Sequence, residues 1–351
     1  MEVDSDEYFK SYEDLDIHEL MLKDKARNEA YKNAIFANKH LFQDKIVLDV
    51  GAGTGILSIF AAQAGAKKVY AVEASKLFEL AREIVKENGF EDVIEVVHCK
   101  IEDFTLPDDV EKVDVIVSEF MGFYLLHESM LDSVILARER FLKPNGSMFP
   151  DRAIIYISPC RIPSLFEDWE NVSGVKMTKF AEQLRKQRTT KPEIASIQSS
   201  DLLSDETIIA FLDLNDISTS DLDRFDFNEV IVANKEGRVE GICIWFDVLF
   251  PSDNDEIVLS THPQCESTHW KQTIVPIPEN NETVEAFSPI AFKLTIQRHP
   301  EHFRRYNILL EILDPYSDEV IHPLPCDCNL TKCILTKAHL QSLSENDFVN
   351  A

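Results

Sequence analysis

Apolar and polar residues follow two different patterns along the chain. Between residues 45 and 150, short β-rich apolar runs alternate with longer amphipathic stretches. We expect strands at 46–50, 69–72, 94–97, 113–117 and 147–149, and helices at 56–64, 76–88 and 129–141. Strands that alternate with helices predict an α/β, Rossmann-like domain, whose mostly parallel sheet binds a ligand at the carboxyl ends of its strands.

Beyond residue 150 the apolar runs follow one another without intervening helices. They lie at 153–157, 207–214, 241–250, 270–275, 292–297 and 306–313. This spacing predicts an antiparallel β-barrel or sandwich. Residues 163–195 interrupt the runs, and we expect them to form an exposed helical arm, because Trp169, Val172 and Phe180 have no core of their own there.

These patterns divide the chain into four regions. We expect a helical region at 1–44, where apolar residues recur at helical spacing. The α/β domain at 45–150 and the β-barrel domain at 151–328 follow it. Residues 329–351 form a C-terminal extension to which the pattern assigns no role.

Composition and charge narrow the class of protein. The chain has 351 residues, of which 44% are hydrophobic, and this is ordinary for a globular protein with two cores. No apolar run reaches the about 18 residues of a membrane span, and the N-terminus is acidic, so we expect an intracellular protein with no membrane partner. The formal net charge of -27 disfavours direct nucleic-acid binding, and it either attracts cationic partners or simply keeps the protein soluble.

A glycine-rich turn follows the first predicted strand. Gly51, Gly53 and Gly55 crowd this turn, and Glu73 ends the next strand, about 20 residues on, where a nucleotide-binding βαβ unit places an acid to hold ribose hydroxyls. Asp49, two residues before Gly51, would repel a pyrophosphate. A ligand with a ribose and positive charge fits this turn better than a dinucleotide or no ligand, and S-adenosylmethionine is such a ligand.

Two glutamates follow the strand at 113–117. Glu119 and Glu128 lie in the loop SEFMGFYLLHESML, at the edge of the sheet where the ligand is expected. Paired glutamates in a loop are commonly solvated. These two lie among apolar residues, and buried acids require a cationic partner.

Three separated motifs resemble those of the protein arginine N-methyltransferases. VLDVGAGTGIL is similar to the family's first cofactor motif, SEFMGFYLLHESML to its double-glutamate loop, and Thr268, His269 and Trp270 to its threonine-histidine-tryptophan loop. The resemblance covers residues 7–328. The phrases AGTGILSIF, YAVEAS and LLHESML resemble most the nuclear, histone-modifying member of the type I branch, which forms asymmetric dimethylarginine.

The resemblance implies roles for individual residues. Residues 1–44 would form a lid over S-adenosylmethionine, and 163–195 the arm that docks on a second subunit. Implied cofactor contacts are Tyr8, Phe9, Tyr12, His18, Arg27 at the methionine carboxylate, Glu73 at the ribose, and Ile101 and Glu102 at the adenine. Implied catalytic residues are Glu119 and Glu128, which would clamp the substrate guanidinium, and the pair of Asp24 and His269. The implied substrate pocket contains Met21, Met130 and Trp270.

The implied activity is mono- and asymmetric dimethylation of arginine in histone tails or RNA-binding, glycine-arginine-rich proteins, by a homodimer in the nucleus and cytoplasm. Two departures from the family pattern are Phe120 in place of a tryptophan and Phe123 in place of a tyrosine. They remove two polar groups from the pocket. A catalytically silent scaffold that binds arginine-rich tails and a small-molecule methyltransferase are the alternative functions.

Seven cysteines are scattered over the chain. Their odd number predicts no disulfide framework and is compatible with a reducing compartment. Cys326, Cys328 and Cys333 lie close together in the sequence, but no fourth ligand stands at a spacing typical of zinc sites. We therefore expect free thiols and no metal.

Overall fold

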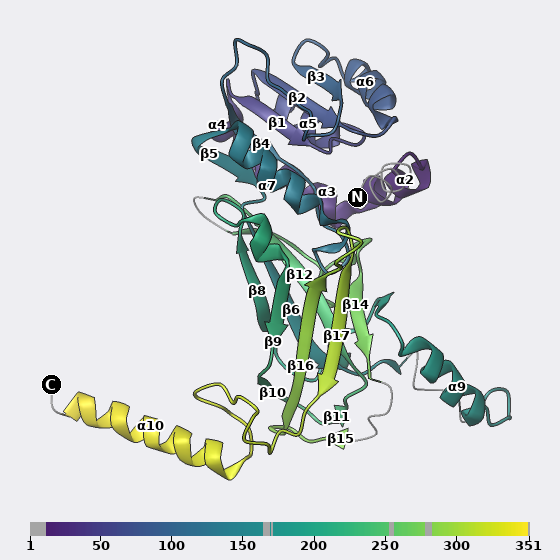
Figure 1. Ribbon diagram of the computed structural model, residues 1–351, viewed down its shortest axis with the longest axis vertical. Helices are drawn as coiled ribbons and strands as arrows, with labels where there is room; N and C mark the ends of the chain where they lie inside the picture. Colours follow the sequence, from purple (N-terminus) through teal and green to yellow (C-terminus); the bar gives the residue numbers. More distant parts are fainter. Residues whose placement is uncertain (1–11, 164–168, 170, 253–255, 278–282, 350–351) are drawn as a thin grey trace.

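The computed structural model describes residues 12–163, 169, 171–252, 256–277 and 283–349. Figure 1 shows two domains stacked along the long axis, with the parallel sheet at the top and the antiparallel strands below it. The N-terminal helices lie beside the junction of the two domains. Helix α10 (Thr331–Val349) extends away from the opposite end of the second domain.

A five-stranded sheet forms the first domain, in the strand order β3-β2-β1-β4-β5. Its elements are β1 (Ile46–Val50), α5 (Ile56–Gln63), β2 (Lys68–Glu73), α6 (Leu77–Glu87), β3 (Ile94–His98), β4 (Val113–Val117), α7 (Met130–Phe141) and β5 (Leu142–Phe149). All neighbouring strands are parallel, which confirms the predicted Rossmann-like sheet. The strand order reverses between β1 and β4, the position at which open α/β sheets bind ligands.

The central strands are mostly apolar because they are covered on both faces, and Asp49 in β1 and Asp114 in β4 are the exceptions. Val47 and Leu48 of β1 are fully buried, as are Val115 and Ile116 of β4. Continuous apolar runs of this kind are typical of parallel strands between layers of helices. Because the strands are buried between helices, a ligand is left to bind at the loops that follow the strand ends.

Strand β5 differs from its prediction. We expected a strand at 147–149, whereas the strand extends from Leu142 to Phe149. Its register shifts, because Leu142 pairs with Val113 and Ser147 pairs with Val115. Pro144 has no N–H to contribute to a ladder, which is consistent with an irregularity at this point of the strand.

Antiparallel sheets form the second domain, as predicted. The larger sheet contains β6 (Arg152–Cys160), β7 (Glu193–Ala195), β8 (Thr207–Asp213), β12 (Gly241–Phe250), β13 (Ile257–Ser260) and β14 (Gln272–Pro276). The smaller sheet contains β9 (Arg224–Phe227), β10 (Val230–Val232), β16 (Pro289–Arg298) and β17 (Tyr306–Ile312), and β11 (Gly237–Arg238) pairs with β15 (Thr283–Val284). Buried Phe246 from the larger sheet and Phe292 from the smaller belong to one continuous core.

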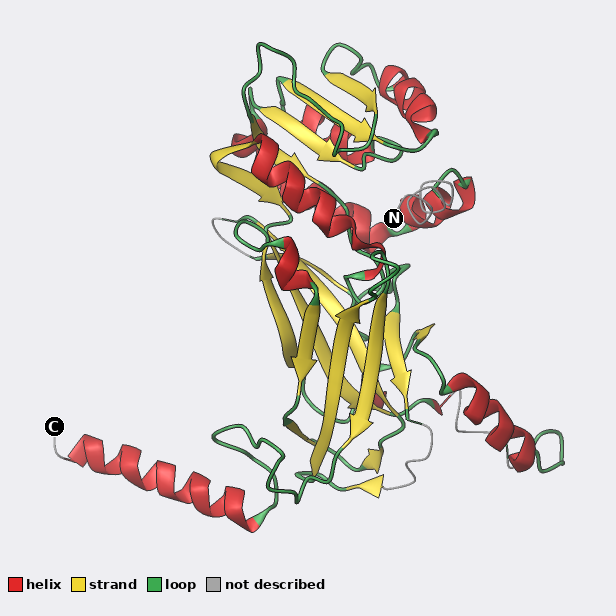
Figure 2. Cartoon of the chain, viewed as in Figure 1, coloured by secondary structure: helices red, strands yellow, loops and turns green. Residues whose placement is uncertain are grey.

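The segment 163–195 contains one described helix rather than a continuous helical arm. Helix α9 (Thr178–Arg188) projects from the second domain, as Figure 2 shows. Residues 193–195, which we expected to be helical, form β7 and pair with β14. The pairing is not visible in the sequence, because β7 is short and its partner lies far along the chain. Phe180 on α9 is 56% exposed.

Among the described residues, three N-terminal helices connect the domains. They are α2 (Leu15–Lys23), α3 (Lys25–Ala37) and α4 (Lys39–Phe42). Tyr31 of α3 is fully buried, and its ring packs edge-on against Phe250 of the second domain. Its hydroxyl donates to the carbonyl of Ser118 in the first domain, at 2.9 Å. No helix within the described ranges has the length and apolar character to cross a membrane.

Candidate active site

Side chains from both domains line a pocket of about 350 Å³ at the carboxyl ends of β1, β2 and β4. It lies at the reversal of strand order, beside the junction seen in Figure 1. Sixteen lining residues matter most here: Tyr12, His18, Met21, Arg27, Gly51, Gly53, Glu73, Ile101, Glu102, Glu119, Phe120, Phe123, Glu128, Met130, His269 and Trp270. The structure therefore brings together most of the residues that the sequence analysis selected. Tyr8 and Phe9 lie outside the described residues.

The glycine turn brings the backbone close to the pocket. Gly51 has φ of +72°, and a side chain there would overlap the terminal methyl group of Met130. The positive φ favours glycine at this position, because residues with side chains rarely adopt it, whereas the flexible end of Met130 can move aside for a Cβ. Glu73 braces the turn, because its carboxylate accepts the N–H groups of Gly53 at 2.8 Å and of Ser75 at 2.7 Å. A carboxylate has about four acceptor sites, so Glu73 retains capacity for ligand hydroxyls.

Asp49 does not occupy the position that we predicted. It is 1% exposed and is absent from the pocket lining, because it lies in the buried strand β1 beneath the glycine turn. One carboxylate oxygen accepts the Ser58 hydroxyl at 2.7 Å, and the other has no hydrogen-bond partner among the described residues. Burial raises the pKa of Asp49 to about 7. Asp49 therefore lies beneath the glycine turn and does not face a ligand in the pocket.

Glu119 follows β4 and is held in an ion pair. The Nε of Arg27 donates to its Oε2 at 2.9 Å, and both side chains are 8% exposed. Its Oε1 accepts the N–H of Met121 at 3.1 Å. We predicted that Arg27 contacts the cofactor; the structure places it in the pocket lining and beside Glu119, so it joins the two expected subsites.

Glu128 lies on a strained turn. Its φ is +75°, and the next residue, Ser129, has φ of +53°, a conformation that non-glycine residues seldom adopt. Arg304 of the second domain stabilises this turn, because its carbonyl accepts the Glu128 N–H and its Nη1 donates to the Glu128 carbonyl, both at 2.8 Å. The Tyr12 hydroxyl donates to Oε2 of Glu128 at 2.5 Å. Strain held in place by its surroundings is common at functional sites.

Asp24 and His269 form a pair across the domain junction. Asp24 Oδ2 lies 2.7 Å from His269 Nδ1 and also accepts the His269 backbone N–H at 2.8 Å. Asp24 Oδ1 accepts the N–H of Arg27 and caps α3. Burial favours the neutral acid, but these hydrogen bonds outweigh it and leave the pKa of Asp24 below its ordinary value. The carboxylate is thus ionised at neutral pH and holds the imidazole at the pocket wall.

The remaining predicted residues complete the pocket walls. Met21 from α2 and Met130 from α7 both line it. The Trp270 indole N–H donates to the carbonyl of Met121 at 2.7 Å, which connects the second domain to the glutamate loop. His18 is buried, and its Nε2 lies 2.9 Å from the carbonyl of Tyr12. Glu102 also lines the pocket and accepts the Ser133 hydroxyl at 2.7 Å.

Arg304 is a pocket residue that the sequence did not reveal. It lies in the segment HPEHFRR, which resembles no motif that we identified, and its contact with Glu128 spans 176 positions. Two adjacent arginines also offered no basis for choosing one of them. A contact between such distant positions is not visible in local patterns.

Two family models match the chain. One is described as the arginine methyltransferase oligomerization subdomain and matches residues 151–313. The other is described as a methyltransferase domain and matches residues 47–146. Each match falls within one of the two domains.

Similar proteins match over most of their length. A probable protein arginine N-methyltransferase 1.2 from Arabidopsis thaliana is 39% identical over 87% of this chain and 82% of its own. Protein arginine N-methyltransferase 6 from Danio rerio is 44% identical over 76% of this chain and 78% of its own. A solved Trypanosoma brucei PRMT1 enzyme-prozyme heterotetramer with AdoHcy has a TM-score of 0.77 at 34% identity, covering 89% of this chain and 98% of that one.

Proposed function

The chain belongs to the protein arginine methyltransferase family, and we propose that it uses the pocket to transfer methyl groups from S-adenosylmethionine to arginine side chains of proteins. The observation that carries the proposal is the convergence of Glu119 and Glu128 on one pocket with Glu73. The first two suit a guanidinium and the third suits a ribose. A small-molecule methyltransferase would require no such glutamate pair.

The pocket fits a cationic methyl donor better than a phosphate-bearing one. Four glutamates line it, Glu73, Glu102, Glu119 and Glu128, against the basic residues Arg27, Lys100 and Arg304. Arg27 is paired with Glu119, and Arg304 donates to the Glu128 carbonyl. Glu73 would hold the ribose, while Ile101 and Glu102 would border the adenine. When bound, S-adenosylmethionine supplies an electrophilic methyl group on a sulfonium.

Two carboxylates can localise the charge of a guanidinium. An arginine side chain stays protonated at neutral pH, and its nitrogens are poor nucleophiles while the charge is delocalised. Glu119 and Glu128 would form paired hydrogen bonds with the planar group and draw its positive charge toward one side. This leaves one terminal nitrogen oriented for attack, and fixing that orientation lowers the barrier.

The proton released on methylation requires an acceptor. Asp24 holds Nδ1 of His269, and His269 lines the pocket. Because the pKa of Asp24 lies below its ordinary value, the carboxylate stabilises an imidazolium beside it. We assign late proton acceptance to Glu128 or to the pair of Asp24 and His269.

We further propose asymmetric dimethylarginine as the final product. Met21 and Met130 line the pocket, and slim, adaptable thioether side chains admit a methylated nitrogen again. The test is incubation with labelled S-adenosylmethionine and histone or glycine-arginine-rich peptides, followed by chromatography of the hydrolysed product. Symmetric dimethylarginine as the main species would overturn the type I assignment. Intact cofactor binding without turnover would favour a silent scaffold.

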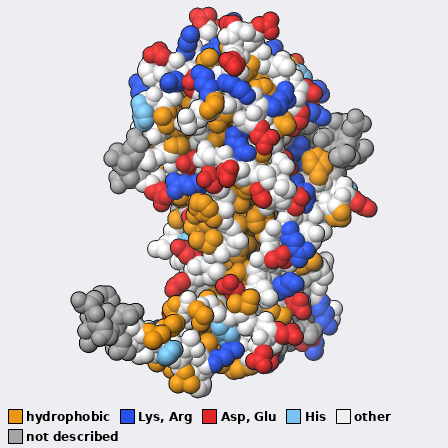
Figure 3. Space-filling model, turned by 60° about the vertical axis from the view of Figure 1, so that its left-hand side comes forward, with side chains coloured by type: hydrophobic (Ala, Val, Ile, Leu, Met, Phe, Trp, Pro, Cys, Tyr) orange, Lys and Arg blue, Asp and Glu red, His pale blue; other side chains and the backbone are white. Residues whose placement is uncertain are grey.

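The proposed assembly is a homodimer in which α9 docks on the partner's cofactor-binding domain. Val175 and Phe180 of the arm are 52% and 56% exposed, and apolar residues so exposed suit an interface. Hydrophobic side chains also gather over the second domain in Figure 3. Ile208 and Phe211 of β8 are among the exposed apolar residues of this domain. Light scattering should give a dimer, and Phe180→Asp should weaken it. An active wild-type monomer at micromolar concentration would contradict the proposed assembly.

A further inference from the structure

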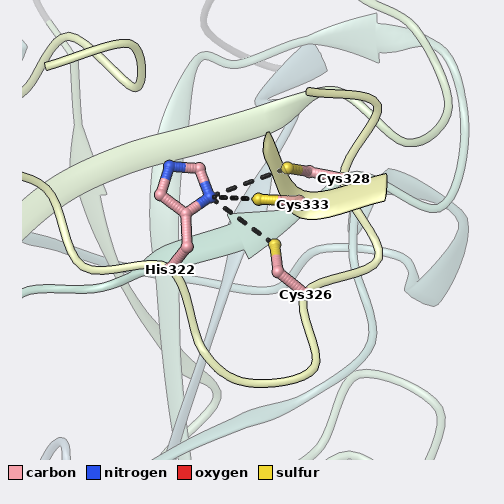
Figure 4. Close-up of side chains that lie close together, drawn as sticks. All are labelled: His322, Cys326, Cys328 and Cys333. Atoms are coloured by element: carbon pink, nitrogen blue, oxygen red, sulfur yellow. Dashed lines mark hydrogen bonds between the residues drawn. The ribbon is translucent and has the colours of Figure 1, made fainter. Parts of the chain in front are cut away.

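Four side chains with potential metal-ligand atoms meet near the start of α10, the helix that projects from the end of the second domain in Figure 1. They are His322, Cys326, Cys328 and Cys333, and their ligand atoms all lie within 4.8 Å of one another. Figure 4 shows the three sulfur atoms facing one nitrogen of the imidazole. His322 Nδ1 lies 3.6 Å from Sγ of Cys326, 3.6 Å from Sγ of Cys328 and 3.3 Å from Sγ of Cys333.

These distances match the edges of a tetrahedron around zinc. Zinc binds histidine nitrogen at about 2.0 Å and cysteine sulfur at about 2.3 Å, so tetrahedral geometry places nitrogen and sulfur about 3.5 Å apart. The three cysteines are 2–5% exposed. The other ring nitrogen of His322, Nε2, lies 3.1 Å from the carbonyl of Pro315. A proton on Nε2 shared with that carbonyl leaves the Nδ1 lone pair directed at the sulfurs, as in established zinc sites.

We propose that His322, Cys326, Cys328 and Cys333 bind one Zn²⁺ ion in a closed structural site. Three thiolates and one imidazole fill a tetrahedral shell and leave no open position for a substrate. If the three cysteines were only buried core residues, their packing against Val232 and Leu330 would be expected. That explanation does not account for the convergence of all three sulfur atoms on one imidazole nitrogen. All three cysteines are free, so no disulfide accounts for their approach.

The site lies beyond the residues that the two family models match. The two family models end at residues 146 and 313, before the first of the four ligands. We expected no metal because no fourth ligand stands at a spacing typical of zinc sites. The structure supplies His322, four positions before Cys326, and the spacing Cys-X-Cys differs from the Cys-X2-Cys typical of zinc motifs.

The ion would fix the beginning of α10. Cys333 is in the first turn of this helix, and its N–H donates to the carbonyl of Leu330 at 3.0 Å. His322 lies in the loop after β17. A shared ion would therefore join the helix to the sheet domain. A small pocket opens beside the cluster and supplies an entry path for the ion; it is lined by His322, Cys326, Cys333 and Lys332. Three thiolates and Zn²⁺ together carry a net charge of −1, which the positive charge of Lys332 complements.

Metal analysis of the full-length protein tests the proposal. Protein purified under reducing conditions with Zn²⁺ and passed through a desalting column should retain one zinc per chain. Cys333→Ser should lower the zinc content about tenfold or more. Cys265→Ser removes an exposed thiol elsewhere and should leave the zinc content unchanged. Equal zinc content in the Cys333→Ser variant and wild type, or zinc-free wild type, would overturn the proposal.

A second measurement on the wild-type protein does not depend on how the variants fold. Apo protein titrated with Co²⁺ should develop the visible bands and sulfur-to-metal charge-transfer absorption of a tetrahedral thiolate site, complete at one equivalent, and Zn²⁺ should abolish them. Chelation should make three further thiols reactive toward a thiol reagent. Only octahedral Co²⁺ spectra, or a disulfide among these cysteines in freshly purified reduced protein, would contradict the zinc site.

Discussion

The two halves of the active-site pocket are built in different ways. The glycine turn of the cofactor half comes from one continuous stretch, in which the Glu73 carboxylate braces the turn by accepting the backbone N–H of Gly53. The acceptor half depends on distant contacts, because Arg304 holds Glu128 across 176 positions and Trp270 contacts Met121 across 149. The first domain can therefore form its own cofactor turn, whereas the glutamate loop reaches its strained shape only when the second domain is in place.

This comparison predicts that changes in the acceptor half affect turnover and leave cofactor binding intact. The largest effect is expected for Glu128→Gln, which keeps the shape of the side chain and removes its charge. We expect kcat to fall by about 10²–10³-fold, with the Kd for S-adenosylmethionine within about twofold. Steady-state kinetics and calorimetry measure the two quantities.

Glu139→Gln is the matched control for this change. Glu139 is exposed on α7, so its loss should leave both quantities unchanged. If Glu128→Gln retained near-normal turnover, or lost turnover and cofactor affinity equally, the separation between the two halves would be wrong.

The second effect tests the interdomain support directly. Arg304→Met removes the Nη1 hydrogen bond to the Glu128 carbonyl and keeps much of the apolar stem. The strained turn should relax and displace Glu128, and we expect kcat to fall on the order of 10-fold to 100-fold with little change in cofactor affinity. Arg305→Met, at the exposed neighbouring position, should behave as wild type. Equal kinetics for the two variants would show that the turn holds its shape without Arg304.

The same division explains which features the sequence could predict. Strands β1 and β4 and the glycine turn follow from local apolar runs and from glycine's freedom at positive φ, so their places were predicted closely. Pairing of β7 with β14, and the contact of Arg304 with Glu128, connect distant segments and have no local signal. The family motifs compensated for this at His269, whose partner Asp24 is 245 positions away.

Two further misses have a different origin. Asp49 was expected at the pocket surface because strand periodicity does not say how deep a residue at the end of a strand lies, and the structure buries it beneath the turn. His322 was missed because the zinc patterns that we considered rely on regular spacing. In the folded loop, the imidazole of His322 reaches the thiols although its spacing in the sequence fits none of these patterns.

A change in the cofactor half should produce the opposite result. Glu73→Gln keeps one acceptor oxygen but removes the charge that braces the turn and would bind the ribose. Losing hydrogen bonds to a charged group costs about 1.5–3 kcal/mol, so we expect the Kd for S-adenosylmethionine to rise about 10-fold to 100-fold. At saturating cofactor, kcat should stay near the wild-type value. Glu79→Gln, exposed on α6, is the control, and an unchanged Kd in Glu73→Gln would refute the ribose assignment.

The smallest effect on turnover is expected beneath the cofactor turn, at Asp49. Burial is the largest influence on the pKa of Asp49 and raises it from the ordinary 3.8 to about 7. The hydrogen bonds from Ser58 and the charge of Arg27 lower this pKa, and the charge of Glu73 raises it, each by less than burial does. The folded state therefore binds this proton more tightly than the unfolded state does. Stability from this group is complete below about pH 4 and is lost as the pH rises to about 7.

Asp49→Asn removes the titrating group and keeps an acceptor for Ser58. The free energy of unfolding of the variant, relative to wild type, should increase between about pH 4 and about pH 8, by up to about 4 kcal/mol. Denaturant unfolding of both proteins across this range measures the difference, and Asp44→Asn, at an exposed position before β1, controls for the loss of a surface charge. A difference that stays constant with pH would mean that Asp49 is ionised in the folded protein at all these pH values. The cofactor turn would then tolerate a buried charge, and the unpartnered oxygen of Asp49 would have to be solvated within it.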